Sequence, residues 1–243
     1  MIVTNRRRFA LGAAGLAAFL AVLAFWIAPG AGGTSWLSRA DGFFNRLSKD
    51  SAFRGLPELR ARAESFRGTA FSVSVATENP EDAAALAAVF RLALAGSAGT
   101  GAGAEADGCR ARLAGDLGAA ALALMDDAEE LHRGGDERLL ARFGLSGREV
   151  VYRYWQALGA IRGDCLRRGE TAAAALAGDL RTRVCEPAYN FHGIAPASAS
   201  ESCGTLALLL GFYVAYTVWF GFSILLLFEG LGIGPRLRKC RET

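Results

Sequence analysis

The residues best suited to chemistry in this sequence are five cysteines, which could form disulfides, bind a metal or act as nucleophiles. Metal-binding cysteines commonly occur as C-x-x-C pairs and haem attachment uses C-x-x-C-H, and the sequence contains neither pattern. The two histidines, His132 and His192, form neither H-E-x-x-H nor an i,i+4 pair. We therefore expect no metal and no cofactor. Four cysteines remain as disulfide candidates: Cys109, Cys165, Cys185 and Cys203.

Motifs of nucleophilic or phosphate chemistry are also missing from the sequence. There is no G-x-S-x-G and no G-x-x-x-x-G-K-[ST]. The Gly/Ala/Ser run at 96–103 lacks the lysine that would follow a phosphate loop, and its composition is typical of a mobile loop. Four acidic residues near the end of a predicted helix could bind a cation, but a solvated acidic face is the favoured interpretation. They are Asp126, Asp127, Glu129 and Glu130. We expect the protein not to be an enzyme.

Two aromatic segments are candidates for binding. Tyr152, Tyr154 and Trp155 could line a ligand pocket, although helical spacing places the last two on an apolar face and favours packing in the core. The second segment is expected to be a loop near the membrane, and loops often carry function. This candidate interaction loop consists of Tyr189, Asn190, Phe191 and His192. The alternative is a loop that is only anchored by its two aromatic residues.

Two long apolar blocks must position these residues. The segments at 9–28 and 205–233 each contain about 20 consecutive apolar or uncharged residues, enough for a helix to cross a hydrocarbon core of about 30 Å. Neither has an ionisable residue in its interior, so a transporter or pump built from this chain alone is not favoured. We predict two transmembrane helices.

The charges beside the blocks predict their orientation. Three arginines precede the first block and four basic residues follow the second, while 29–203 carries 20 basic and 22 acidic residues. Because positive residues stay on the cytoplasmic side, both tails (1–8 and 234–243) should be cytoplasmic and 29–204 should lie outside, in a bacterial periplasm. The slightly acidic central region argues against nucleic-acid binding. The segment Asn5–Leu11 also resembles a twin-arginine export signal, so cleavage near residue 30 is an alternative to a retained anchor.

This topology places four cysteines in an oxidising compartment and Cys240 in a reducing one, which is consistent with up to two disulfides. If the two last helices of the central region form a tight hairpin, Cys165 and Cys185 are about 20 Å apart and are the least expected pair, because a disulfide needs Cα atoms within about 7 Å. Cys185 with Cys203 is slightly favoured, and the pairing stays open.

The central region is predicted to be mainly helical with a small β-α-β-α element, half of a ferredoxin-like arrangement. Strand periodicity at 69–76 is followed by a helix opened by Asn79-Pro80, a second alternating segment at 109–113 and a helix opened by Asp116. Ser146 with Glu149 predicts another helix start, and Pro187 is expected to end the last helix of the region.

Small residues on the two spans are candidates for helix packing, either between the spans or against a partner's helix. They are Ala13, Ala17, Ala21, Gly211 and Ala215. The predicted fold class is membrane-anchored α+β, with two transmembrane helices flanking a mainly helical extracytoplasmic domain.

The predicted function is a non-catalytic inner-membrane protein, a scaffold or accessory subunit of an envelope complex. Its expected partners are the lipid bilayer and another membrane protein or a second copy, with no nucleic acid. The alternatives are a periplasmic ligand sensor that signals through a partner, and a protein like a polysaccharide chain-length regulator, which shares only the two-span outline.

Overall fold

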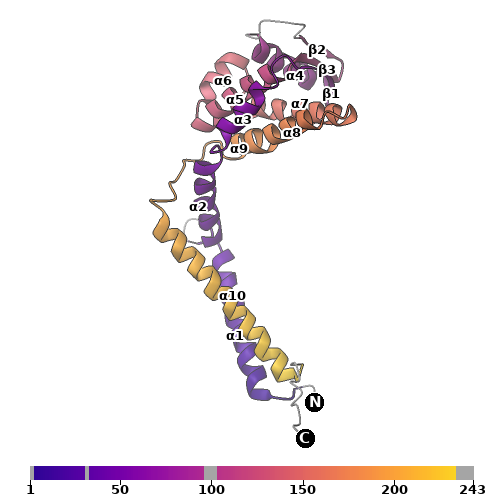
Figure 1. Ribbon diagram of the computed structural model, residues 1–243. Coiled ribbons are helices and arrows are strands. Elements are labelled where there is room, and N and C mark those ends of the chain that lie inside the picture. Colours follow the sequence, from indigo (N-terminus) through magenta and orange to yellow (C-terminus); the bar gives the residue numbers. More distant parts are fainter. Residues whose placement is uncertain (1–2, 31–32, 96–102, 234–243) are drawn as a thin grey trace. The chain divides into compact units, whose positions relative to one another are not determined.

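The computed structural model describes residues 3–30, 33–95 and 103–233, which form a mostly helical protein with one small sheet (Figure 1). The chain divides into two compact units. Unit 1 comprises 1–44 and 197–243, and unit 2 comprises 45–196.

Unit 1 is built on two long apolar helices. Helix α1 spans Arg6–Ile27 and helix α10 spans Cys203–Leu231, close to the predicted bounds, and both are long and apolar enough to cross a membrane. The two helices run alongside each other (Figure 1). A third helix, α2 (Trp36–Ser51), begins in this unit.

Glycines and aromatic rings form the contact between α1 and α10. A Cβ atom on Gly12 would lie 2.8 Å from the carbonyl oxygen of Ser223, so only glycine allows this approach. Further along, the ring of Phe19 stacks on Tyr216 with centroids 4.1 Å apart. The phenol of Tyr216 also donates a hydrogen bond to the Phe19 carbonyl oxygen at 3.0 Å.

The small residues expected to pack differ in how far they are buried. Ala17 and Ala21 are exposed on α1, and Ala13 is half-buried. On α10, Ala215 is exposed and a Cβ on Gly211 would meet nothing within 4 Å. The closest approach occurs at glycines because an alanine methyl is already too large there. Packing of the alanine faces against a partner's helix stays a prediction.

Unit 2 contains a three-stranded sheet in the order β1-β3-β2. Strands β1 (Ala70–Ala76) and β2 (Gly103–Asp107) both pair antiparallel with β3 (Arg110–Asp116), so β1 and β2 are parallel to each other with β3 between them. Alternate residues of β1 are buried, as the strand periodicity predicts. They are Phe71, Val73 and Val75.

Two helices complete a β-α-β-β-α arrangement. Helix α4 spans Pro80–Leu94 and helix α5 spans Leu117–Arg133, and each begins at the predicted cap, since the side chains of Asn79 and Asp116 accept hydrogen bonds from first-turn amides. The order equals the first five elements of the ferredoxin-like β-α-β-β-α-β motif. The predicted β-α-β-α element is therefore present, with one strand more than expected.

That extra strand begins at the last residue of the loop predicted at 96–103. Gly103 begins β2, while 96–102 lie outside the described residues. The turn between β2 and β3 contains Gly108 with φ of 56°, and Cys109 follows it and is exposed. Cys109 was expected on the alternating face of a strand, but the hairpin turn places it in solvent.

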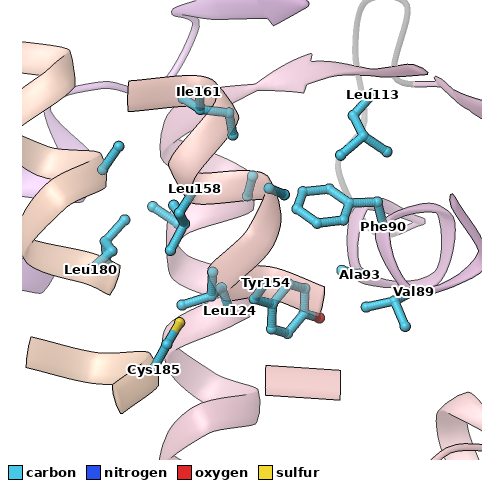
Figure 2. Close-up of a cluster of buried hydrophobic side chains, with 14 of the residues drawn as sticks. Val89, Phe90, Ala93, Leu113, Leu124, Tyr154, Leu158, Ile161, Leu180 and Cys185 are labelled. Atoms are coloured by element: carbon cyan, nitrogen blue, oxygen red, sulfur yellow. The ribbon is translucent and has the colours of Figure 1, made fainter. Parts of the chain in front are cut away.

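The rest of unit 2 is helical and packs around one long helix, α7 (Gly147–Arg167), which Ser146 caps as predicted. Figure 2 shows Tyr154, Leu158 and Ile161 of α7 in the centre of the core, with side chains of α4, β3, α5 and the last helices around them. The other helices are α3 (Leu56–Glu64), α6 (Asp136–Phe143), which the sequence analysis missed, and α8 (Thr171–Leu180).

The chain does not end its helix at Pro187, contrary to the prediction. A π-helical turn, η1 (Arg181–Cys185), follows α8 and leads directly into α9 (Glu186–Asn190), where Pro187 occupies the first turn. The Glu186 N–H donates to the Arg181 carbonyl oxygen five residues back, and Pro187, which has no N–H to place, follows this widened turn. Tyr189 and Asn190 are therefore helical, and only Phe191 and His192 lie in the turn that follows.

Candidate functional site

A cavity of about 260 Å³ opens between α7 and the η1–α9 segment of unit 2. Side chains of α7 form one wall, and the π turn and α9 form the other. We call this cavity the aromatic pocket, and its lining residues are Val151, Tyr152, Trp155, Cys185, Glu186, Tyr189 and Asn190.

Helical spacing explains why these residues meet. Val151 and Trp155 are one turn apart on α7, and Tyr152 lies beside them. On the other wall, Glu186, Tyr189 and Asn190 have the spacing i, i+3, i+4 and so share one face of α9. The helical continuation through Pro187 creates this second face, which an irregular chain would not provide.

Aromatic rings are the main feature of the pocket. The rings of Tyr152 and Trp155 are nearly parallel, with centroids 6.0 Å apart and an interplanar angle of 14°. Tyr189 contributes from the opposite wall, with its centroid 6.5 Å from that of Tyr152. The indole Nε1–H of Trp155 donates a hydrogen bond to a carboxylate oxygen of Glu186 at 3.1 Å, which fixes the indole against α9.

Arginines lie over all three rings. The guanidinium of Arg181 is 3.6 Å from the ring centroid of Trp155, and that of Arg148 is 4.3 Å from Tyr189. Arg153, at 5.9 Å from Tyr152, is also paired with Asp82 and Glu149. Within the part of the chain that the structure describes, no ion pair with a carboxylate is found for Arg148 or Arg181. The surroundings of the pocket are therefore positively charged.

Cys185 contributes an apolar wall to the pocket and not a reactive thiolate. Its side chain is buried, and burial raises the pKa of the thiol far above its ordinary value. Cys165 is buried in α7 and its thiol pKa is also raised by burial, whereas Cys109 and Cys203 are exposed. These four cysteines carry free thiols in the structure, so their predicted pairing stays a prediction.

The pocket unites parts of both aromatic segments. Tyr152 and Trp155 line it, which agrees with the pocket alternative, while Tyr154 is fully buried in the core. Of the candidate interaction loop, Tyr189 and Asn190 line the pocket. Phe191 and His192 are half-buried and do not line it, and the Nε2 atom of His192 is 3.9 Å from a carboxylate oxygen of Asp136.

The sequence analysis did not identify Glu186 as a pocket residue. Glu186 lies three and four residues before Tyr189 and Asn190, which is the spacing of residues on one face of a helix. Because Pro187 was predicted to end the helix, this shared face was not predicted.

The acidic cluster of α5 has structural partners and is not simply a solvated face. Asp127 is buried, and its carboxylate accepts hydrogen bonds from the Tyr154 hydroxyl at 2.7 Å and from Arg142 at 2.6 Å. Burial raises the pKa of Asp127, with the two donors opposing that shift. Asp126 and Glu129 both pair with Arg60, at 2.7 and 2.8 Å.

No group of three or more His, Cys, Asp or Glu residues that could hold a metal ion is found within 3–30, 33–95 and 103–233. Comparisons of the chain with protein-family models, with curated proteins and with solved structures give no match. The chemistry of the aromatic pocket must therefore be argued from its own geometry. A preformed apolar cavity with a few polar groups and a positive rim is suited to binding.

Proposed function

We propose that the chain is a two-span protein of the bacterial inner membrane that holds unit 2 in the periplasm as a non-catalytic binding module, an accessory or scaffold subunit of an envelope complex. The observation that carries the anchoring is the exposed apolar surface of α1 and α10. Even after the two helices have packed together, only 6% of the most apolar 18-residue window of either helix is buried. Such a surface is unfavourable in water and favourable in hydrocarbon.

The orientation is supported by the arginines and by the contacts at one end of the helix pair. The arginines at positions 6–8 lie in the first turn of α1, and Arg8 pairs with Glu229 of α10 at 2.9 Å. The backbone amides of Thr4 and Asn5 both donate to the carbonyl oxygen of Gly230. These contacts favour a retained first span over a cleaved signal, with the basic ends of both spans on the cytoplasmic side.

The proposed topology is tested by labelling single cysteines in intact spheroplasts with a membrane-impermeant maleimide. In one variant only Cys109 is kept, and in the other only Cys240, with the remaining cysteines replaced by alanine. We expect Cys109 to react in intact spheroplasts, because it is exposed in the β2–β3 turn of unit 2. Cys240 should react only after the membrane is opened.

A third variant that keeps only Cys185 serves as the control for folding. Its buried thiol should stay unlabelled before and after lysis until the protein is denatured. Labelling of Cys240 in intact spheroplasts, or protection of Cys109, would contradict the proposed orientation.

The accessory role is tested by isolating the protein from the membrane in a mild detergent and measuring its mass by light scattering. A stable assembly with another membrane protein or with a second copy is expected. A lone monomer that persists in several mild detergents would count against a scaffold.

The aromatic pocket also favours a second candidate, a periplasmic ligand sensor that signals through a partner. A ligand that binds only the folded state raises the melting temperature of unit 2 according to its concentration relative to Kd. The sensor predicts such a shift with a small molecule, and the shift should disappear in a Tyr189→Ala variant.

A further inference from the structure

We propose that the aromatic pocket is a docking site for an acidic segment of a partner protein. One bulky apolar side chain of that segment enters between Tyr152, Trp155 and Tyr189, and its neighbouring carboxylates pair with arginines around the pocket. This inference rests on the proposed function, because it identifies how the binding module engages its partner.

The size of the pocket favours a single side chain. Cavities that hold drug-sized molecules usually measure about 300–1,000 Å³, and this one measures about 260 Å³. At protein interfaces, most of the binding energy comes from a few anchors that fill such small pockets, and tyrosine and tryptophan are common among them. Tyr152 and Tyr189 are 42% and 36% exposed, so an incoming side chain can reach both rings.

A second cavity is lined by residues of α7, α8 and η1. It measures about 360 Å³, is more open, and includes Arg162 and Arg181 among its lining residues. Arg181 also lies over Trp155, so this residue connects the two cavities. An extended segment with its anchor in the aromatic pocket can therefore bring an adjacent carboxylate to Arg181 and Arg162.

The arginines have unused capacity for a carboxylate. Arg181 is half-buried and has no ion pair with a carboxylate in the described part of the chain. A carboxylate is the group that the planar guanidinium binds best, through parallel hydrogen bonds. Arg148 and Arg162 are likewise without an ion pair in the described part of the chain. Asp179, which also lines the second cavity, is already bound to Arg62 at 2.7 Å.

The remaining charges nearby do not reverse this preference. Glu186 is the one carboxylate that lines the aromatic pocket, and it accepts the Trp155 indole hydrogen bond. Arg153 pairs with both Asp82 and Glu149, which leaves one carboxylate in excess there. The three arginines without an ion pair among the described residues, Arg148, Arg162 and Arg181, still outnumber that carboxylate and Glu186, so an acidic segment is attracted and a basic one is repelled.

The test uses the full chain in nanodiscs and three fluorescein-labelled peptides of equal length. The first has a central tryptophan flanked by glutamates and serines, the second has alanine in place of tryptophan, and the third has lysines in place of the glutamates. Fluorescence polarisation should show saturable binding of the first peptide. The second and third should bind at least about tenfold more weakly, which is the usual effect of losing an anchor or a complementary charge.

Variants locate the binding surface. Tyr189→Ala removes a pocket wall and Arg148→Glu reverses one rim charge, and each should weaken the first peptide by about tenfold. The matched controls are Leu140→Ala, an apolar residue that is 50% exposed on α6, and Arg110→Glu in β3. Both controls should bind as the wild type does, and circular dichroism melting checks that all four variants fold.

Several results would overturn the docking proposal. These are the absence of saturable binding, equal binding of the alanine or lysine peptide, and equal affinities of pocket variants and controls. Indole-3-acetate binding as tightly as the peptide would identify a small ligand as the occupant instead. None of these outcomes affects the labelling of Cys109 and Cys240, so failure of the docking site is distinguishable from failure of the proposed topology.

Discussion

Asp127 is a buried carboxylate in a cluster that joins four helices. It belongs to α5, accepts a hydrogen bond from Tyr154 of α7 and pairs with Arg142 of α6. Arg142 also donates to the carbonyl oxygen of Leu92 in α4 at 3.2 Å. A buried acid is tolerated only when its oxygens have donors, so this cluster fixes how α4, α5, α6 and α7 pack.

Removing one donor should therefore destabilise unit 2. We predict that Tyr154→Phe lowers the free energy of unfolding by about 1–3 kcal/mol, because Asp127 keeps its burial and loses a hydrogen bond. Tyr152→Phe is the matched control, since Tyr152 is 42% exposed and should change stability by less than about 0.5 kcal/mol. Urea unfolding of the full chain in detergent, followed by circular dichroism, measures both. Equal effects of the two variants would show that Asp127 does not depend on Tyr154.

The raised pKa of Asp127 gives stability a definite dependence on pH. At a pH below about 4 the carboxyl is protonated in both the folded and the unfolded chain. As the pH rises, the unfolded chain ionises first, so the folded state binds more protons and loses relative stability until the pH exceeds the raised pKa. The loss is about 1.4 kcal/mol for each unit by which the pKa is raised.

Comparison with Asp127→Asn isolates this contribution. We predict that the wild type minus variant difference in unfolding free energy falls as the pH rises above about 4, the ordinary pKa of an aspartate, because asparagine has no charge to bury. Urea titrations at several pH values measure the difference. If it rises with pH, the ion pair with Arg142 outweighs burial and the ionised form is the favoured one.

At the scale of elements, local signals were sufficient for some predictions. The alternation of Phe71, Val73 and Val75 and the caps at Asn79, Asp116 and Ser146 predicted β1, α4, α5 and α7, because periodicity and capping are encoded within a few residues. Strand β2 was missed because the alternation of Ala104 and Ala106 with Glu105 and Asp107 is short and uses only small apolar residues, so pairing with β3 is needed to order it.

The aromatic pocket could not be predicted as a whole, because it too depends on contacts between elements that are distant in the sequence. Tyr152, Trp155 and Tyr189 were each identified as candidates, but their meeting depends on the π turn that carries the chain through Pro187. A π turn arises from packing around it and not from a residue pattern that the sequence displays. The contact residues of the spans were missed because Gly12 and Gly15 differ little in type from the alanines beside them.

The α1–α10 pair gives a prediction with an internal control. Gly12→Ile should separate the helices, since even a Cβ would come within 2.8 Å of the Ser223 carbonyl oxygen. Gly211→Ile should have no effect on the pair, because a Cβ there meets nothing within 4 Å. The reporter is a cysteine pair replacing Gly15 and Ser223 in an otherwise cysteine-free chain, because a Cβ on Gly15 would lie 3.4 Å from the Ser223 Cβ, close to the spacing that a disulfide needs.

Oxidative crosslinking of this reporter should be efficient in the parent and in Gly211→Ile, and should fall several-fold in Gly12→Ile. Equal crosslinking in all three would show that the glycine approach does not hold the helices together. A loss with Gly211→Ile alone would place the contact on the face predicted from the sequence.

At the scale of the whole molecule, the two units have different physical requirements. Unit 2 buries its apolar residues in a continuous core and should be stable in water. Unit 1 leaves most of its apolar surface exposed, and the proposed topology would cover that surface with lipid. Under the proposed topology, α1 is either a retained anchor or a signal that is removed after export. The arginines at 6–8 have a different role in each case: they set the orientation of an anchor, or they are recognised as an export signal.

A conservative substitution separates the two alternatives. A twin-arginine signal is read by its arginine pair, whereas the positive-inside rule depends on charge, which lysine keeps. We predict that replacing Arg7 and Arg8 together by lysine leaves the labelling of Cys109 in intact spheroplasts unchanged. The intact mass of the purified protein should remain that of the full chain, 25.6 kDa before substitution. Loss of Cys109 labelling, or a mass smaller by the first 28–33 residues, would instead identify α1 as an export signal, and the contacts of α1 with Ser223 and Gly230 would then be absent from the mature protein.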